Sequence, residues 1–220
     1  METWFQTNEH ITNKYKGFEH YYPIFKRGIF LDTAPLFILI CGNYDKNNNT
    51  KLIENFNAKE NKIVKDRQYK IFDYNYLIAF LNSLDLKQIP LLITPYIFTE
   101  FIRHLWTIVD NPKQFRDVIE KSFKTKSYLK DSTNNLCCYH FFSDDLFLNK
   151  ELEIGDISII ISIKEFEKDK GPRTILTSDE PFALISANKY KFITIYYEDI
   201  RTATFQLGYE NIPKEFLKDI

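Results

Sequence analysis

What the sequence has little of excludes several classes of protein. It contains three cysteines, Cys41 and the adjacent pair Cys137 and Cys138, in a chain of 220 residues. An odd number of cysteines without CxxC spacing argues against both a disulfide framework and a cysteine-ligated zinc site. A reducing compartment is the simplest home for such a chain, so we predict a cytoplasmic protein.

Long apolar runs are also lacking. The longest stretches, around residues 29–41 and 157–163, are shorter than the ~20 apolar residues of a membrane-spanning helix, and Asp32 interrupts the first. The N-terminal stretch METWFQTNEHITNKYKG has no basic start followed by an apolar core, so we expect no secretory signal. We predict a soluble protein without a membrane partner.

The chain has no excess of charge of one sign. It carries 29 basic and 30 acidic side chains, and its formal net charge of -1 provides no global positive field to attract nucleic acid. Nucleic-acid binding would therefore need local patches. Two segments combine basic and aromatic residues, and their candidate RNA-binding cations are Lys26, Arg27, Lys121, Lys124 and Lys126. The alternatives are a packed N-terminal arm and a solvated helix face.

What the sequence does contain is an alternation of strand-like and helix-like segments. Strand composition occurs at residues 28–32, 90–94, 173–177 and 191–197. Helical patterns occur at residues 33–42, 71–86, 95–109, 111–129, 155–171 and 179–189. This alternation indicates an α/β protein with a mainly parallel sheet and helices on both faces. The length favours one domain over residues 1–220.

Local signals divide this domain further. Residues 1–26 are predicted as an N-terminal arm, and the polar residues 43–70 as a loop-rich insertion, with Gly42 ending the helix before it. Residues 155–171 are rich in β-branched side chains, but an apolar stripe at helical spacing favours a helix there. The helix over 71–86 has a predicted core face of Phe72, Tyr76, Ile78, Ala79 and Leu81.

Acidic residues lie at four predicted strand ends or helix starts. They are Asp32, Glu100, Asp156 and Asp179. In a parallel sheet such places meet at the carboxyl edge, so we expect the four carboxylates to converge. Like charges about 4 Å apart repel by roughly 4 kcal/mol per pair at an effective dielectric of about 20, so a cation or protons must occupy the cluster. All-oxygen ligands point to magnesium or manganese.

Each acidic residue also has a simpler explanation. Asp156 before an apolar run is a candidate N-cap, and Asp179 is a candidate turn or cap residue. Glu100 on a helix is more often solvated or paired, here with Arg103. Asp32 is the hardest to explain in this way, because a carboxylate between two apolar runs is costly to bury without partners. The prediction of a metal site therefore depends on the four residues as a set.

Nearly the whole chain after about Lys26 resembles the PIN-domain nucleases, with one acidic residue in each of four ordered motifs. The motifs read FLDTAPLFIL, ITPYIFTEFIRHL, LEIGDISIIISIKE and ILTSDEPFALISANKYKFITIYYEDIR. The resemblance implies a three-layer α/β/α fold and a supporting hydroxyl at Thr177. It implies that the catalytic, metal-binding residues are Asp32, Glu100, Asp156 and Asp179. Two motifs depart from the family pattern: EIGD replaces the leucine and threonine frequent before the third acid, and TSD has serine where a second acid is common.

The same resemblance implies a magnesium- or manganese-dependent ribonuclease, as the toxin of a toxin–antitoxin pair or a related defence effector. Two cations can hold a scissile phosphate and activate a water, so no nucleophilic side chain is required. The sequence agrees, because it lacks GxSxG and Walker-type motifs. An antitoxin protein and a second copy of the chain are the protein partners that this interpretation allows.

Other functions stay open at this point. A non-catalytic PIN-like module that binds RNA or protein is disfavoured by the four intact acids. A metal-dependent phosphatase is disfavoured by Ala34, where an aspartate-nucleophile enzyme needs a second aspartate. His104, four residues after Glu100, is compatible with shared metal ligation, although local packing is the commoner role of such a histidine.

Overall fold

The computed structural model describes residues 24–59, 68–83, 89–123, 129–131, 152–170 and 174–207, together with Ile212 and Leu217. Its sheet has five strands, all paired in parallel, in the order β3-β2-β1-β4-β5. The strands are β1 (Ile29–Leu31), β2 (Leu91–Ile93), β3 (Leu129–Asp131), β4 (Thr174–Thr177) and β5 (Ile193–Tyr196). This confirms the predicted α/β fold with a parallel sheet.

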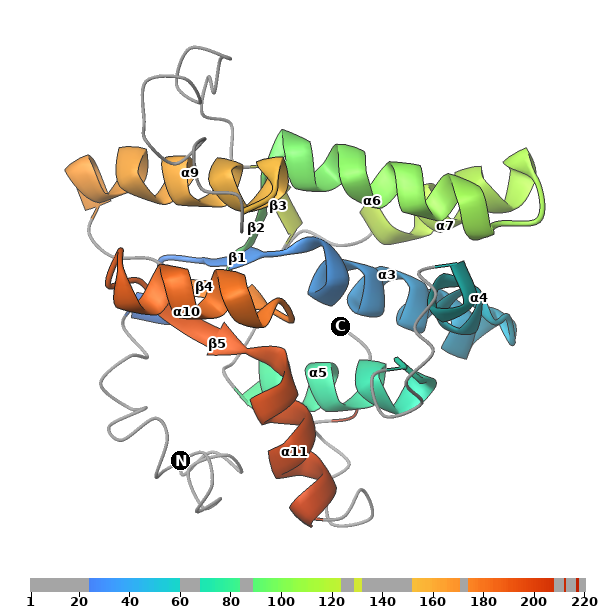
Figure 1. The fold of residues 1–220 in the computed structure, drawn as a ribbon. Helices are drawn as coiled ribbons and strands as arrows, with labels where there is room; N and C mark the ends of the chain where they lie inside the picture. The colour runs from blue at the N-terminus through green and yellow to red at the C-terminus, as the bar shows by residue number, and fades with distance from the viewer. Residues whose placement is uncertain are drawn as a thin grey trace.

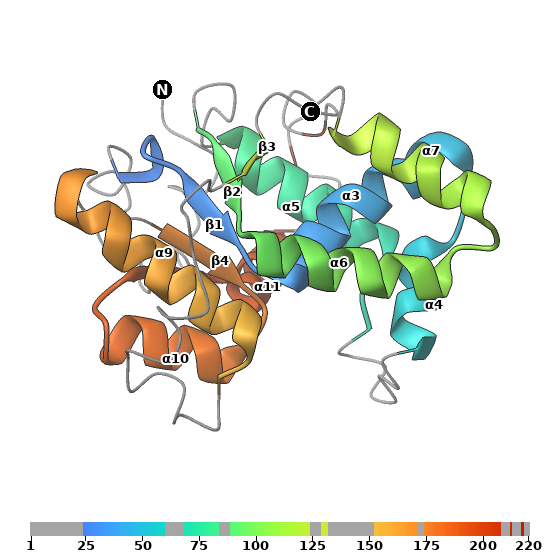
Figure 2. The ribbon, with the colours of Figure 1, turned by 90° about the horizontal axis from the view of Figure 1, so that it is seen from above.

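Helices cover both faces of the sheet, as expected for a three-layer fold (Figure 1). They are α3 (Thr33–Asn48), α4 (Leu52–Lys59), α5 (Ile71–Ser83), α6 (Pro95–Ile108), α7 (Pro112–Phe123), α9 (Ile154–Lys170), α10 (Glu180–Asn188) and α11 (Tyr197–Leu207). Figure 2 shows α9 and α10 on one side of β1 and β4, with α3, α5 and α7 on the other.

The strand order brings the carboxyl ends of β1 and β4 side by side at the centre of the sheet. The chain leaves β1 toward β2 on one side and later returns to β4 on the other, so the winding reverses between these strands. Leu31 pairs with Leu176, and the Asp32 N–H donates to the Leu176 carbonyl oxygen at 3.0 Å. Ligands of open parallel sheets bind in the crevice at such a reversal.

Helix α3 is a core helix, which explains its long apolar run. Every side chain from Leu36 to Cys41 is fully buried, and α4, α5, α6 and α7 pack around the helix. Pro35 lies in its first turn, where the missing N–H leaves no hydrogen bond unmade. Neither α3 nor any other helix in the described ranges is both long and apolar enough to cross a membrane.

The prediction of a loop-rich segment was wrong for residues 43–59, which are mostly helical. Helix α3 continues through Gly42 and is capped by Asn49, whose φ of 52° ends the helical path. Asp45 then accepts hydrogen bonds from the backbone N–H groups of Leu52 and Ile53, at 2.8 and 2.9 Å, and so starts α4. A cap at the end of α3 and side-chain acceptors at the start of α4 allow this polar segment to be helical. Residues 60–67, and residues 1–23 of the predicted arm, lie outside the described residues.

Three further details differ from the sequence prediction. Leu129, expected at the end of a helix, begins β3 and pairs with Leu91, and α7 ends at Phe123. Helix α11, which follows β5 directly, was not predicted. In α5, Phe72 is exposed, whereas the other four predicted core residues are buried.

Gly42 allows close packing of α3 against α5. A Cβ atom at Gly42 would lie 2.4 Å from Cβ and 2.7 Å from Cγ of Tyr74, closer than real Cβ atoms approach other atoms. Tyr74 is itself fully buried, and its hydroxyl donates to Asn43 Oδ1 at 3.1 Å. The glycine is therefore required by packing in the middle of a helix, and not by a helix end.

We expect Gly42→Ala to destabilise the fold by about 1–2 kcal/mol net, because α3 and α5 must separate to accept the methyl group at a cost near the upper end of about 1–3 kcal/mol. The gain in helix propensity, about 1 kcal/mol, opposes this cost without cancelling it. Asn47→Ala on the exposed face of α3 is the matched control and should change stability by less than about 0.5 kcal/mol. Urea unfolding measures both, and a Gly42→Ala protein as stable as the wild type would contradict the packing.

Candidate functional site

Asp32 directly follows the central strand β1 and is the N-cap of helix α3. Its Oδ1 accepts a hydrogen bond from the Thr33 N–H at 2.6 Å, and its Oδ2 accepts one from the Thr177 hydroxyl at 2.6 Å. Asp32 is buried, and a buried carboxylate needs hydrogen-bond partners, which these two groups provide. The predicted supporting role of Thr177 corresponds to this contact between β4 and β1.

Asp179 is a helix N-cap, as its simpler explanation proposed, whereas Asp156 lies inside the first turn of α9 and is not the N-cap. Asp179 is the N-cap of α10, where its Oδ1 accepts from the Phe182 N–H at 2.8 Å. Asp156 lies in the first turn of α9, and its Oδ2 accepts from the Glu153 N–H at 2.8 Å, as the acid of a capping box does. The Asp179 N–H also donates to the Thr177 hydroxyl at 2.9 Å, which links it to Asp32 through one residue.

Glu100 reaches the same place from α6. Its Oε2 accepts from the Thr33 hydroxyl at 2.8 Å, and its Oε1 lies 3.6 Å from His104 Nε2. Arg103, the partner suggested by the sequence, is not part of either contact. The start of α9 approaches closely, since a Cβ at Gly155 would lie 3.1 Å from Glu100 Oε2. Gly155 thus allows α9 to pack beside this carboxylate.

The four predicted acids line one pocket, so their expected convergence is confirmed. The pocket has a volume of about 280 Å³ at the carboxyl edge of β1 and β4. Its other lining residues are Thr33, Ala34, Phe56, Tyr69, His104, Glu153 and Ser178. Acids separated by more than a hundred residues therefore share a single site.

Several of these lining residues were not predicted from the sequence, among them Thr33, Glu153, Tyr69 and Ser178. Glu153 brings a fifth carboxylate, and no sequence signal marked it, because glutamate is not a favoured N-cap residue. Its backbone N–H donates to Asp156, which holds it beside the site. Tyr69 comes from the segment read as an insertion, and no local pattern marked it. Ser178 lies between Thr177, the last residue of β4, and Asp179, the N-cap of α10, and it hydrogen-bonds to Tyr69.

Burial and repulsion both disfavour the charged forms of the two most buried acids. Burial raises the pKa of Asp32 from 3.8 to about 6, against the lowering effect of its hydrogen bonds, and the charges of Glu100 and Asp179 raise it further. The pKa of Asp156 rises to about 8, first through burial and then through the charge of Asp32. The pKa of Glu100 is instead lowered, mainly by its hydrogen bond with His104. The pocket therefore holds more negative charge than its surroundings neutralise.

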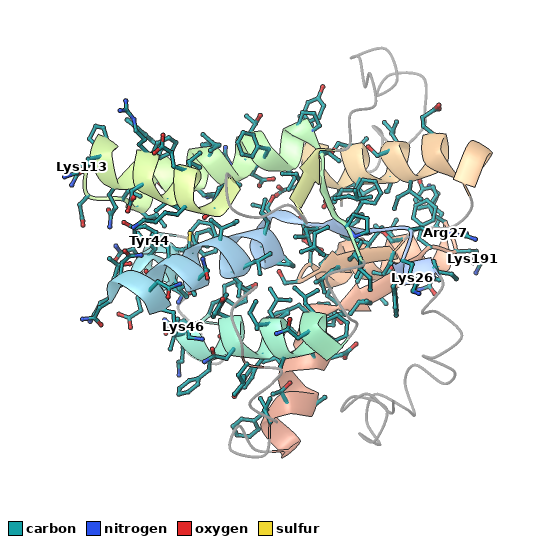
Figure 3. All side chains as sticks on the ribbon, turned by 180° about the vertical axis from the view of Figure 1, so that it is seen from behind. Lys26, Arg27, Tyr44, Lys46, Lys113 and Lys191 are labelled. Carbon is teal, nitrogen blue, oxygen red and sulfur yellow. The ribbon has the colours of Figure 1, made fainter. Side chains whose placement is uncertain are left out.

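Two predicted RNA-binding cations lie away from the pocket. Lys26 and Arg27 form the turn before β1, at the opposite end of that strand from Asp32. Figure 3 shows both near Lys191, which precedes β5, at one end of the molecule. Proximity in sequence to Asp32 did not mean proximity in space, because the strand lies between them.

The other predicted cations belong to α7 and the segment after it. Lys121 makes an ion pair with Asp117 at 2.8 Å and donates to Asn48 Oδ1 at 3.1 Å, so it is engaged in a local network. Lys124 and Lys126 lie outside the described residues. RNA binding by these lysines stays a prediction.

The acid pocket is not a closed metal centre in the described residues. Within those ranges, no group of three or more His, Cys, Asp or Glu side chains is arranged to hold a metal ion. The donor chemistry nevertheless suits a hard cation, since the pocket presents carboxylate and hydroxyl oxygens.

Comparisons of the chain with protein-family models, with curated proteins and with solved structures gave no match. The resemblance to PIN-domain nucleases therefore stays a prediction from the motifs.

The raised pKa values predict that the metal-free protein loses stability as pH rises from about 4 to about 8. In this window the folded protein binds more protons than the unfolded chain, so the free energy of unfolding falls with pH. Asp156→Asn keeps an acceptor for the Glu153 N–H but removes the charge, and should stabilise the protein at pH 8 by about 1–3 kcal/mol.

The matched control is Asp110→Asn, which removes an exposed carboxylate outside the pocket. Urea unfolding in EDTA across this pH range measures the three proteins. An Asp156→Asn protein with the same pH dependence as the wild type would show that repulsion in the pocket does not limit stability.

Proposed function

We propose that this protein is a metal-dependent ribonuclease that cleaves RNA phosphodiester bonds at the acid pocket. The observation that carries the proposal is the convergence of Asp32, Glu100, Asp156 and Asp179 on one pocket at the strand reversal. Carboxylates whose pKa values are raised by burial and by neighbouring charge, here Asp32 and Asp156, are typical of functional sites. A divalent cation would compensate this charge.

The donor set favours magnesium or manganese, and the ligands would be these same four acids. Hard cations of this kind prefer oxygen ligands, and no cysteine lines the pocket in the described residues. Since the carboxylates are held by caps and hydroxyl groups in the described structure, the proposal requires their side chains to turn toward the ion.

The chemistry needs no nucleophilic side chain. A bound divalent cation supplies a water of lowered pKa and stabilises the negative charge on the leaving oxygen. The chain's own groups orient the acids: Thr33 and Thr177 hold Asp32, and Thr33 with His104 holds Glu100. The Thr177 hydroxyl donates a hydrogen bond to Asp32 and accepts one from the Asp179 N–H, so it serves as a support.

The resemblance to toxin-type PIN-domain nucleases extends the proposal to biology. A toxin or defence effector that cleaves cellular RNA is the role it favours, with an antitoxin protein as partner, a second copy of the chain as another, and the cytoplasm as the compartment. These points rest on the motifs alone.

One observation favours the non-catalytic alternative, an RNA- or protein-binding module of the same fold. Asp156 and Asp179 already serve as helix caps, a structural use that needs no metal. Capping alone does not explain the acids, however, because asparagine caps a helix about as well as aspartate without adding charge.

Metal binding should be visible as thermal stabilisation. We expect magnesium or manganese to raise the melting temperature increasingly with concentration, because a ligand of the native state stabilises it by mass action. Asp32→Asn should lose much of this response, whereas Asp110→Asn should keep it. Differential scanning calorimetry at fixed ionic strength measures the melting temperature of each protein. Equal metal-induced shifts in the wild type and Asp32→Asn would rule out Asp32 as a ligand.

Cleavage should require both the metal and the carboxylates. We expect the wild type to cleave single-stranded RNA with magnesium or manganese, and Asp32→Asn or Asp156→Asn to lower the rate by orders of magnitude with the fold intact. The assay uses mixed labelled RNAs, with EDTA and Asp110→Asn as controls. RNA binding without cleavage under any metal would favour the non-catalytic module, and cleavage that survives EDTA would contradict the metal mechanism.

A further inference from the structure

Trp106 exposes a large aromatic surface on α6, the helix that also carries the pocket residue Glu100. Its side chain is 56% exposed, and the ring of Phe115 on α7 packs against it edge to face, with centroids 4.9 Å apart. Phe115 is partly buried against the core, so it fixes the indole from one side. An isolated exposed hydrophobic residue is ordinary, so its significance depends on what lies beside it.

Trp106 is the outer member of a row of three side chains on α6 that leads to the pocket. Glu100, Arg103 and Trp106 are spaced three residues apart on α6, and side chains at this spacing are neighbours on a helix surface, with Cβ atoms about 5–6 Å apart. Arg103 is exposed, and its charge is close enough to act on the Glu100 carboxylate. The row thus carries an acid in the pocket, then a cation, then an aromatic platform.

These two side chains have the chemistry of a nucleotide subsite. A guanidinium group binds phosphate oxygens through a planar fork of N–H donors, and an indole stacks on any nucleobase. We propose that Arg103 and Trp106 bind one nucleotide of a single-stranded polynucleotide beside the acid pocket, with its phosphate on Arg103 and its base on Trp106. This inference rests on the proposed function and names the form of its substrate.

The geometry favours an unpaired strand over a duplex. A base can lie on the exposed indole face only if it has left its own stack, and double-stranded bases are stacked inside the helix. The subsite would therefore select single-stranded segments without reading their sequence, because every base offers a stacking face. A protein partner that covers Trp106 is the competing interpretation, since tryptophan and arginine are also frequent at protein interfaces.

The test uses Trp106 as its own reporter. The chain has two tryptophans, Trp4 and Trp106, so Trp4→Phe leaves Trp106 as the single emitter. This protein is titrated in EDTA with a short uridine-rich RNA, the DNA of the same sequence, and the matching RNA duplex. We expect the single strands to quench the emission and the duplex to do so weakly. Equal quenching by duplex and single strand would overturn the proposal.

Substitutions then separate stacking from charge, with binding read from a labelled RNA in EDTA. Trp106→Ala should weaken binding about tenfold, while Trp106→Phe should keep most of the affinity. Arg103→Gln should reduce the slope of log affinity against log salt by about one unit, and Arg103→Lys should preserve it. Leu184→Ala removes a side chain of similar exposure on α10 and is the control. Unchanged affinity in Trp106→Ala would overturn the subsite.

The outcomes distinguish this inference from the proposed function. Binding in EDTA needs no metal, so Trp106-dependent binding without any cleavage would support the subsite and reject the nuclease. Metal-dependent cleavage with the same KM in the wild type and Trp106→Ala would support the nuclease and reject the subsite. A shift of Trp106 emission with protein concentration alone would show a second copy covering the ring, which also rejects the subsite.

Discussion

The buried carboxylate of Asp32 is the interaction on which the arrangement of the site depends. It accepts one hydrogen bond at the start of α3 and another from Thr177, so it joins the ends of the two central strands. Thr33 then extends the link to Glu100 on α6. Asp32, Thr33 and Thr177 lie at strand ends or a helix start, so the sheet positions them, whereas Glu100 reaches them from the second turn of α6.

This arrangement sets hydrogen bonding against charge. The hydrogen bonds stabilise ionised Asp32, whereas burial and the neighbouring acids disfavour it, and burial has the larger effect on its pKa. A fold that needed only helix caps would avoid this conflict with asparagine side chains. Retaining carboxylates at a cost in stability is typical of functional sites, where activity and stability compete.

The two edges of the sheet differ in charge. The carboxyl ends of β1 and β4 hold the acid pocket, while Lys26, Arg27 and Lys191 precede β1 and β5 and lie together at one end of the molecule (Figure 3). A phosphate-bearing ligand at the pocket must therefore be drawn by cations on nearby helices, and Arg103 is one that lies on the same helix as a site acid. Separation of this kind is invisible in sequence, because Arg27 and Asp32 are only a short strand apart.

Sequence by itself determined the features that depend on local pattern. Residues close in the chain determine the apolar stripe of α6, which includes Ile97 and Phe101, and the change from strand to helix at Asp32. The alternation of strands and helices then predicted a parallel sheet, in which the acids share one edge.

Tertiary structure decided what depends on distant partners. A glycine is compatible both with a helix end and with a close contact between two helices, so the sequence could not distinguish the two at Gly42. The contact with Tyr74, more than thirty residues away, shows that Gly42 is at a close helix contact. Leu129 became part of a strand because β2 offered an open edge, and Tyr69 joined the pocket through the packing of a segment without pattern of its own. Periodicity records which face of an element is buried, but it carries no information on which other element buries it.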